Sequence, residues 1–294
     1  MVNVSVCIPV FNPGAYLSRA ISSVLCQSYP DYELIIVDDG STEPVASVVH
    51  QFDDTRIWYY QNAHNLGLVA NWNRCIELSS GDYITIFHQD DLMNRENLAS
   101  KVAVLDRHSD VGLVYSDITR INADDRFVGK HYIKQPDRDL VMTGATLFAM
   151  VAETGNPIAC PAVMVRRACY RQLGGFDSRL PFATDLEMWL RIARSYAVAY
   201  VAQPLVSHRV HSKQETARFA GSGRDYHDIL NALDIVFSSD LDAAYAVHSH
   251  QAYRTLASQA WAMMRWKLRE YKWRTAGQYG MVAALAAARS LAQI

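Results

Sequence analysis

Residues 33–41, which read ELIIVDDGS, give the strongest indication of how this chain folds. A short apolar run leads into two adjacent carboxylates, Asp38 and Asp39, and then into a Gly-Ser turn. Apolar runs that end in turn residues are typical of buried strands in a parallel sheet. Ligands bind beyond the carboxyl ends of such strands, because the loops converge there on a crevice. The stretch therefore predicts an α/β sheet with a ligand site at this edge.

A second copy of the arrangement occurs at residues 82–91, which read DYITIFHQDD. Together the two strands would bring four carboxylates and the imidazole of His88 to one rim. Such a cluster repels itself unless a divalent cation or a cationic ligand compensates it. Asp90 and Asp91 suit Mg²⁺ or Mn²⁺, which take one or two carboxylates plus phosphate oxygens. For any single Asp pair, the alternative is an Asx-turn or a helix cap.

Strand and helix patterns alternate over the first 117 residues, which predicts a parallel sheet with right-handed crossovers. A hairpin is expected around residues 123–125, and a marked helix from Thr184. From about Gly221 onward the sequence reads as helix, so residues 216–294 are expected to form a helical region after a domain of residues 1–215. Within that domain, residues 1–117 would be the nucleotide-binding half and residues 118–215 the acceptor half.

Composition excludes several classes of protein. A net charge of −2 over 294 residues gives no overall attraction to nucleic acid. The five cysteines show no C-x-x-C spacing, which favours free thiols in a reducing compartment. The glycine loops of NAD-binding and P-loop proteins do not occur, so a phosphate ligand would be held through a metal. No signal peptide is visible and no apolar run would span a bilayer, so a cytoplasmic protein is expected.

Two further groups carry candidate chemistry. Residues 184–187 have the T-x-x-E form of a capping box, which would place Asp185 in the first turn of a helix. An ionised Asp there can act as a general base, although first-turn Asp residues are also common simply because they stabilise helices. Residues 208–211 read HRVH, and alternation along a strand would point Arg209 and His211 the same way. They could meet a diphosphate or complete a metal shell, or lie in a solvated loop.

Taken in order, these motifs resemble the inverting, metal-dependent glycosyltransferases of family 2, which have the GT-A fold. The resemblance covers roughly residues 3–215. It rests on several segments at the family's spacing: residues 4–12 (VSVCIPVFN), 34–42 (LIIVDDGST), 65–67 (NLG), 73–74 (NR), 81–84 (GDYI) and 90–91 (DD). The resemblance implies a Rossmann-like, mostly parallel sheet flanked by helices, followed by a C-terminal helical extension.

The resemblance also implies roles for individual residues. Pro9 and Asp39 would line the nucleobase pocket with Asp38 beside them, and Asn65 would belong to the same donor site. Asp90 and Asp91 would serve the ribose and the diphosphate-bound Mn²⁺ or Mg²⁺. Asp185 would be the catalytic base, and His211 a basic residue near the diphosphate.

This sequence departs from the family pattern in two places. His88 stands where the family often has an acid, so metal binding would rest on Asp90 and Asp91. Thr184 replaces a frequent acid before Asp185, which leaves one candidate base instead of two. The sequence still favours transfer of a sugar from a nucleotide-sugar, UDP-linked first and dTDP-linked second.

The acceptor would be a saccharide or a lipid-linked saccharide, in cell-surface polysaccharide or glycolipid synthesis. The competing hypotheses are a sugar-phosphate nucleotidyltransferase and a non-catalytic binding module on the same fold. A phospho-accepting receiver domain is typically far shorter and would leave the second half of the chain unexplained.

The helical tail includes residues 261–274, which read WAMMRWKLREYKWR. On one continuous helix, Arg265, Arg269 and Lys272 share a face beside Trp266 and Trp273. Basic residues next to tryptophan are typical of helices that lie in a membrane interface. This predicts a peripheral contact with the inner face of a membrane. The alternative is that the strip packs on the catalytic domain or on a second subunit, as in a homodimer.

Overall fold

The computed structural model describes residues 2–131, 133–238 and 241–292. The chain folds into two compact units, and each is built from separated segments. The sheet unit contains Met1–Met142, Ile158–Phe176 and Tyr196–His211, and the helical unit contains Thr143–Pro157, Asp177–Ser195 and Ser212–Ile294. The division expected at residue 215 treats the domains as consecutive pieces, and it stays a prediction.

The sheet unit is built on one mixed sheet, in the strand order β3-β2-β1-β4-β9-β6-β10-β5, with β7 beside β6 and β8 beside β10. Strands β3, β2, β1 and β4 are parallel, as the alternating pattern predicts. Strand β9 lies antiparallel between β4 and β6, which the sequence pattern did not indicate. The strands are β1 (Val4–Val10), β2 (Tyr32–Asp38), β3 (Ile57–Gln61), β4 (Tyr83–Ile86), β5 (Leu92–Met93), β6 (Val111–Ile121), β7 (Phe127–Lys130), β8 (Leu140–Met142), β9 (Val163–Arg166) and β10 (Ala197–Arg209).

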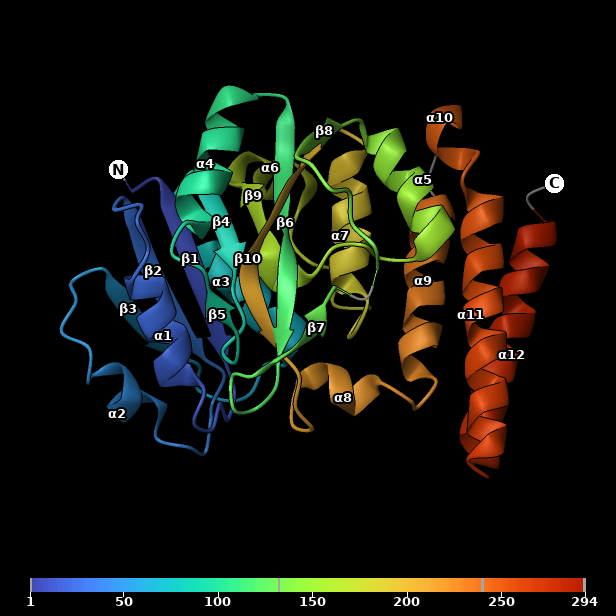
Figure 1. Cartoon of the computed structure of the whole chain (residues 1–294), viewed down its shortest axis with the longest axis horizontal. Coiled ribbons are helices and arrows are strands. Elements are labelled where there is room, and N and C mark those ends of the chain that lie inside the picture. The colour runs from blue at the N-terminus through green and yellow to red at the C-terminus, as the bar shows by residue number, and fades with distance from the viewer. Residues whose placement is uncertain (1, 132, 239–240, 293–294) are drawn as a thin grey trace. The chain divides into compact units, whose positions relative to one another are not determined.

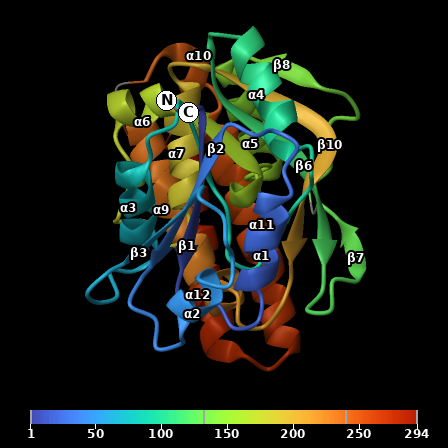
Figure 2. The ribbon, with the colours of Figure 1, turned by 90° about the vertical axis from the view of Figure 1, so that its left-hand side faces the viewer.

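Helices cover both faces of this sheet. Figure 2 shows α1 and α4 on one side and α3 and α6 on the other. Both faces of the sheet are buried because side chains alternate along each strand. In β1, Val6 and Ile8 pack in the hydrophobic cluster that contains α1 and α4 residues, while Cys7 faces the other side. The Cys7 thiol lies 3.6 Å from the carbonyl oxygen of Cys75 in α3. The helices of this unit are α1 (Leu17–Leu25), α2 (Val45–Val49), α3 (Leu68–Leu78), α4 (Asn97–Arg107) and α6 (Arg167–Leu173).

Helix α4 also buries two polar side chains among its apolar ones. Lys101 is 0% exposed, and burial lowers the pKa of its amine to about 7. Its Nζ has no hydrogen-bond partner among the described residues, and neither atom of the Asn97 side-chain amide has one. The apolar spacing of Leu98, Val102 and Leu105 predicts this helix correctly, but it gives no sign that Lys101 turns inward.

The expected hairpin is present, and it is formed by β6 and β7. Its turn is organised by Asn122, whose side-chain oxygen accepts hydrogen bonds from the backbone N–H groups of Asp124 and Arg126, both at 2.9 Å. Asp125 adopts a positive φ of 63° there, a conformation that Asp tolerates better than most residues. Strand β6 continues to Ile121, so it runs directly into the hairpin turn, and β7 pairs with its last residues.

The helical unit contains α5 (Gly144–Thr154), α7 (Thr184–Ala193), α8 (Glu215–Phe219), α9 (Arg224–Ser238), α10 (Ala243–Ala246), α11 (Ser249–Arg269) and α12 (Trp273–Leu291). Its core includes Leu233 of α9, Leu256 of α11 and Val282 of α12. Figure 1 shows α11 and α12 side by side and antiparallel. The described residues after Gly221 contain helices and no strand, which confirms the reading of the tail as helical.

Two expectations for this unit were wrong in detail. Residues 261–274 are not one helix, because the chain turns at residues 270–272, where Tyr271 has a φ of +58°. The T-x-x-E segment is not a capping box, because Thr184 is the first residue of α7 and the N-cap is Ala183, which has no side-chain cap. None of the described helices is both long enough and apolar enough to cross a membrane.

Candidate functional site

The loops that follow β1, β2 and β4 are tied together by side chains at the carboxyl edge of the sheet. The backbone N–H of Phe11 donates to Oε1 of Gln89 at 2.9 Å, which joins the first loop to the third. The Asn12 side-chain oxygen accepts from the backbone N–H of Thr42 at 2.9 Å, which joins the first loop to the second. Pro9 lies half-buried near the end of β1, paired with Val37. The sequence prediction that these strand ends share one rim is therefore confirmed.

Asp38 lies inside the protein, at the end of β2. It is 0% exposed, and its Oδ2 accepts hydrogen bonds from the Tyr59 hydroxyl at 3.0 Å and from the Gln61 side chain at 3.1 Å. Its Oδ1 accepts from the backbone N–H of Ser41 at 2.9 Å. The carboxylate thus holds the β2 loop and β3 in place. Its expected position beside a ligand stays a prediction.

Asp39 connects the same loop to the start of α3. Its Oδ1 accepts from the Leu66 backbone N–H at 2.8 Å, and its Oδ2 accepts from the Gly67 N–H at 2.9 Å. Gly40 makes this approach possible, because it has a φ of +70° and a Cβ there would lie 3.0 Å from the backbone of residues 64 and 65. Asn65 is exposed in this segment. Asp39 and Asn65 are therefore brought together, as the motif spacing predicts, while their contact with a donor stays a prediction.

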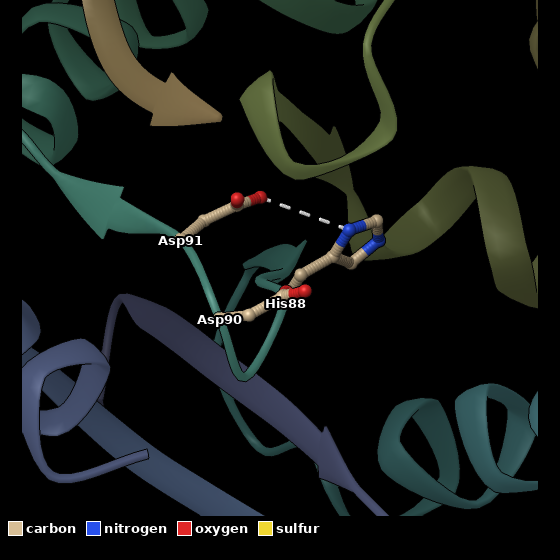
Figure 3. Close-up of side chains that lie close together, drawn as sticks. All are labelled: His88, Asp90 and Asp91. Atoms are coloured by element: carbon tan, nitrogen blue, oxygen red, sulfur yellow. Dashed lines mark ion pairs between the residues drawn. The ribbon is translucent and has the colours of Figure 1, made fainter. Parts of the chain in front are cut away.

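His88, Asp90 and Asp91 form a cluster in the loop after β4. One ligand atom from each residue lies within 4.8 Å of the other two. Figure 3 shows the Asp91 carboxylate pointing toward the His88 ring, with Oδ2 and Nδ1 3.7 Å apart. That distance is too long for a hydrogen bond. Asp91 Oδ2 and His88 Nε2 are buried and have no hydrogen-bond partner among the described residues.

The electrostatics of the cluster are those of an uncompensated site. Burial, together with the nearby charge of Asp90, raises the pKa of Asp91 well above its ordinary value. Burial also lowers the pKa of His88, so its imidazole is neutral at pH 7. For Asp90, burial is outweighed by a hydrogen bond from His211 and by the nearby imidazoles, so its pKa is lowered. A divalent cation is the compensation that this set of two carboxylates and one neutral imidazole fits.

Sequence reasoning assigned the metal to Asp90 and Asp91 alone and left His88 out. The geometry places the imidazole of His88 beside them as a candidate third ligand. The sequence did contain a sign of this, because His88 occupies the position at which the family often has an acid. The residues present therefore fit a divalent metal, with a nitrogen donor in the set.

Arg209 is the last residue of β10 and His211 lies two residues beyond it, and the two side chains face different surroundings. Nε2 of His211 lies 2.8 Å from Oδ2 of Asp90, and its ring packs 4.8 Å from the ring of Tyr16. His211 therefore lies beside a candidate metal ligand. Its contact with a diphosphate stays a prediction.

Arg209 is 0% exposed, so it is not the phosphate contact that the alternation suggested. Its Nε donates to the backbone carbonyl of Asp90 at 2.6 Å, and its backbone N–H donates to Oδ1 of Asp91 at 2.7 Å. Its Nη1 lies 2.5 Å from Oδ1 of Asp125, in the turn of the β6–β7 hairpin. Arg209 therefore positions the Asp90–Asp91 loop against the hairpin. The sequence identified the residue but not this function.

Asp185 lies in the helical unit, in the first turn of α7. Its Oδ1 accepts from the backbone N–H of Leu186 at 2.7 Å, and its Oδ2 accepts a long hydrogen bond of 3.4 Å from the Asn156 side chain. Burial raises the pKa of Asp185 to about 6, although these bonds oppose the rise. The carboxylate is thus mostly ionised at pH 7, with a pKa near neutrality that suits a general base.

The segment that leads into α7 is held by a residue that sequence reasoning missed. Oδ2 of Asp228, in α9, accepts from the backbone N–H groups of Phe182 and Ala183, both at 2.7 Å. Glu187, the expected partner in a capping box, instead pairs with Arg191 at 2.8 Å. Asp228 lies more than forty positions further along the chain, so no local motif could reveal this contact.

Comparisons with known proteins agree with this geometry. The sequence model of the family described as Glycosyl transferase family 2 matches residues 5–173. An uncharacterized protein of Mycobacterium tuberculosis (strain CDC 1551 / Oshkosh) is 30% identical over 236 residues, which cover 76% of this chain and 72% of that protein.

Two solved structures are similar in fold. The structure of S. aureus TarS 1-349 in complex with UDP-GlcNAc is 17% identical, with a TM-score of 0.72, and the match covers 99% of this chain and 89% of that one. The mannosyltransferase PcManGT from Pyrobaculum calidifontis, in complex with GDP-Man and Mn²⁺, is 17% identical with a TM-score of 0.66, and covers 97% and 87%. The mixed sheet flanked by helices is thus the GT-A fold. The family match over residues 5–173, with the shared fold, places the chain in glycosyl transferase family 2, as a glycosyltransferase.

Proposed function

We propose that this enzyme is a metal-dependent, inverting glycosyltransferase that moves a sugar from a UDP-sugar to an acceptor hydroxyl. The observation that carries the proposal is the cluster of His88, Asp90 and Asp91 at the carboxyl edge of the sheet. Two carboxylates and a neutral imidazole suit a divalent ion that binds phosphate oxygens, since the charge of Arg209 does not offset the burial of Asp91. The structures similar in fold support the donor class, since one holds UDP-GlcNAc and the other GDP-Man with Mn²⁺.

In this proposal His88, Asp90 and Asp91 hold Mn²⁺ or Mg²⁺, and Arg209 keeps their loop in place. The bound ion supplies neutralisation of the charge that develops on the leaving nucleoside diphosphate. His211, hydrogen-bonded to Asp90, holds that carboxylate in one orientation. The ordered loops around Pro9, Asp39 and Asn65 bind the nucleoside.

Asp185 serves as the general base. Within the part of the chain that the structure describes, its Oδ2 has only the long contact with Asn156, so it is the oxygen better able to accept a proton. The acceptor hydroxyl gives its proton to this oxygen as its own oxygen bonds to the anomeric carbon. The bond from that carbon to the diphosphate oxygen breaks in the same displacement, so the configuration inverts. The acceptor we propose is a saccharide or a lipid-linked saccharide of cell-surface polysaccharide or glycolipid synthesis.

The test is calorimetric titration of UDP into the purified enzyme, with and without Mn²⁺, followed by a hydrolysis and transfer screen over a panel of nucleotide sugars. We expect UDP to bind more tightly with Mn²⁺, and Asp91→Asn to lose that difference. Asp137→Asn is the matched control, because Asp137 is an exposed carboxylate outside the cluster. Equal affinity for UDP with and without Mn²⁺ in the native enzyme would contradict the metal role.

A further inference from the structure

The turn between α11 and α12 forms the tip of a helical hairpin, which we define as residues 261–275 (Figure 1). The apolar core of the helical unit includes α11 residues up to Ala260 and α12 residues from Val282. Among the described residues, none of residues 261–275 belongs to that core. The tip instead exposes large aromatic side chains: Trp261, Trp266, Tyr271 and Trp273 are 43%, 47%, 80% and 66% exposed.

The tip is also strongly basic. Residues 261–275 contain five basic side chains and one acid, Glu270, which gives a net charge of +4. Glu270 pairs with Lys267 at 3.2 Å and with Lys272 at 3.0 Å. The three arginines of the tip are exposed, and no ion pair joins them to an acid among the described residues. They are Arg265, Arg269 and Arg274.

Lys267 has a separate, structural role in the tip. It is only 5% exposed, and its Nζ lies 3.9 Å from the centre of the Trp266 ring. A Cβ on Gly221 would lie 3.3 Å from the same Nζ, so the amine packs against the segment before α9. Lys267 is therefore buried within the helical unit. It leaves the surface to the arginines and the aromatic rings.

We propose that the hairpin tip binds an anionic lipid surface. Tryptophan and tyrosine rings favour the boundary between headgroups and acyl chains, and arginines beside them attract anionic headgroups. The two kinds of side chain occur together in a short turn, where they can enter that boundary without unfolding α11 or α12. A second copy of the chain is a poorer occupant, because two tips of charge +4 repel each other.

The experiment is co-sedimentation of the full-length protein with vesicles of phosphatidylcholine, with or without about one third phosphatidylglycerol. We expect binding to the anionic vesicles at about 0.05 M salt, and strong weakening at about 0.5 M. The triple variant Arg265→Glu/Arg269→Glu/Arg274→Glu should lose at least about 100-fold in affinity, since each basic residue near such a surface contributes about fivefold and each new carboxylate is repelled by it.

The double variant Tyr271→Ser/Trp273→Ser separates the apolar part from the charge. This variant should bind anionic vesicles more weakly at both salt concentrations, because salt does not screen the contribution from burial of apolar side chains. The control is Arg107→Glu/Arg138→Glu/Arg171→Glu, which reverses three exposed arginines outside the tip and should bind as the native protein does.

Two results would overturn the proposal. One is failure of the native protein to bind anionic vesicles at low salt, and the other is an equal loss in the control and the tip variant. Donor hydrolysis by the tip variants should stay at the native rate. This readout separates the lipid contact from the proposed transferase chemistry.

Discussion

Replacing Lys101 with methionine should stabilise the sheet unit, and the gain should depend on pH. The amine is 0% exposed, has no hydrogen-bond partner among the described residues, and has a pKa lowered by burial from 10.5 to about 7. In the unfolded chain it keeps its ordinary pKa. Protonation therefore favours the unfolded state, and this cost is fully present below the folded pKa and disappears above the unfolded one.

The size of the effect follows from the two pKa values. Their difference corresponds to a cost of about 5 kcal/mol at low pH, since each pKa unit is worth about 1.4 kcal/mol. The cost is still about 4–5 kcal/mol near pH 6.5 and falls to about 1.4 kcal/mol near pH 9.5. Methionine has a similar length and no charge, so it fills the same space without this cost. The gain from Lys101→Met is thus at most about 5 kcal/mol near pH 6.5 and about 3 kcal/mol smaller near pH 9.5.

Urea unfolding at these two pH values measures the free energy of unfolding directly. Lys130→Met is the matched control, because Lys130 is exposed and should change stability by less than about 0.5 kcal/mol. The reasoning is refuted if Lys101→Met is less stable than the native protein near neutral pH. It is also refuted if the variant's gain is the same at both pH values.

Three further predictions concern the site. Asp185→Asn should lower turnover by about 10²–10⁴-fold while the affinity for UDP, measured by calorimetry, is unchanged. In a pH–rate profile, native turnover should fall as the pH drops through about 6, where Asp185 becomes protonated. Native-like turnover of the variant would show that Asp185 only stabilises the start of the helix. Arg209→Met should lower the free energy of unfolding by about 3–5 kcal/mol and weaken Mn²⁺ binding, because Asp125 loses one of its two arginine partners and the Asp90 carbonyl loses its donor. Unchanged Mn²⁺ affinity in the folded variant would contradict the positioning role. Asp228→Ala should lower the free energy of unfolding by about 1–3 kcal/mol, because two backbone N–H groups before α7 lose their acceptor. Urea unfolding measures this, and a neutral result would show that solvent replaces the carboxylate.

The parts of the fold that were predicted from sequence depend on local patterns. The apolar runs before Asp38 and Asp90 report strands buried on both faces, and the loops they end in share one edge because parallel strands point the same way. The helix with Leu98 and Val102 follows from helical spacing. In each case about ten neighbouring residues are enough to predict the element and the place of its polar side chains.

The parts that were not predicted depend on contacts between distant segments. No local pattern indicates that residues 163–166 insert between β4 and β6, or that Asp228 binds the backbone before α7. Arg209 was expected to face a ligand and is buried instead, and no sequence pattern indicates that Lys101 is buried, because lysine and arginine usually lie at the surface. At Glu270–Lys272 the strong helix pattern hid the turn, since these residues carry no glycine or proline to mark it.

The insertion of β9 has a consequence for how the chain folds. Strand β6 has no hydrogen-bonded partner among β1 to β4, because its neighbours in the sheet are β7, β9 and β10. During synthesis, the first four parallel strands can assemble early, but β6 can join them only after residues 163–166 have left the ribosome. Until then β4 presents a bare edge that can pair with another chain. Nascent or truncated forms that end before β9 should therefore aggregate, and they should depend on chaperones more than the finished protein does.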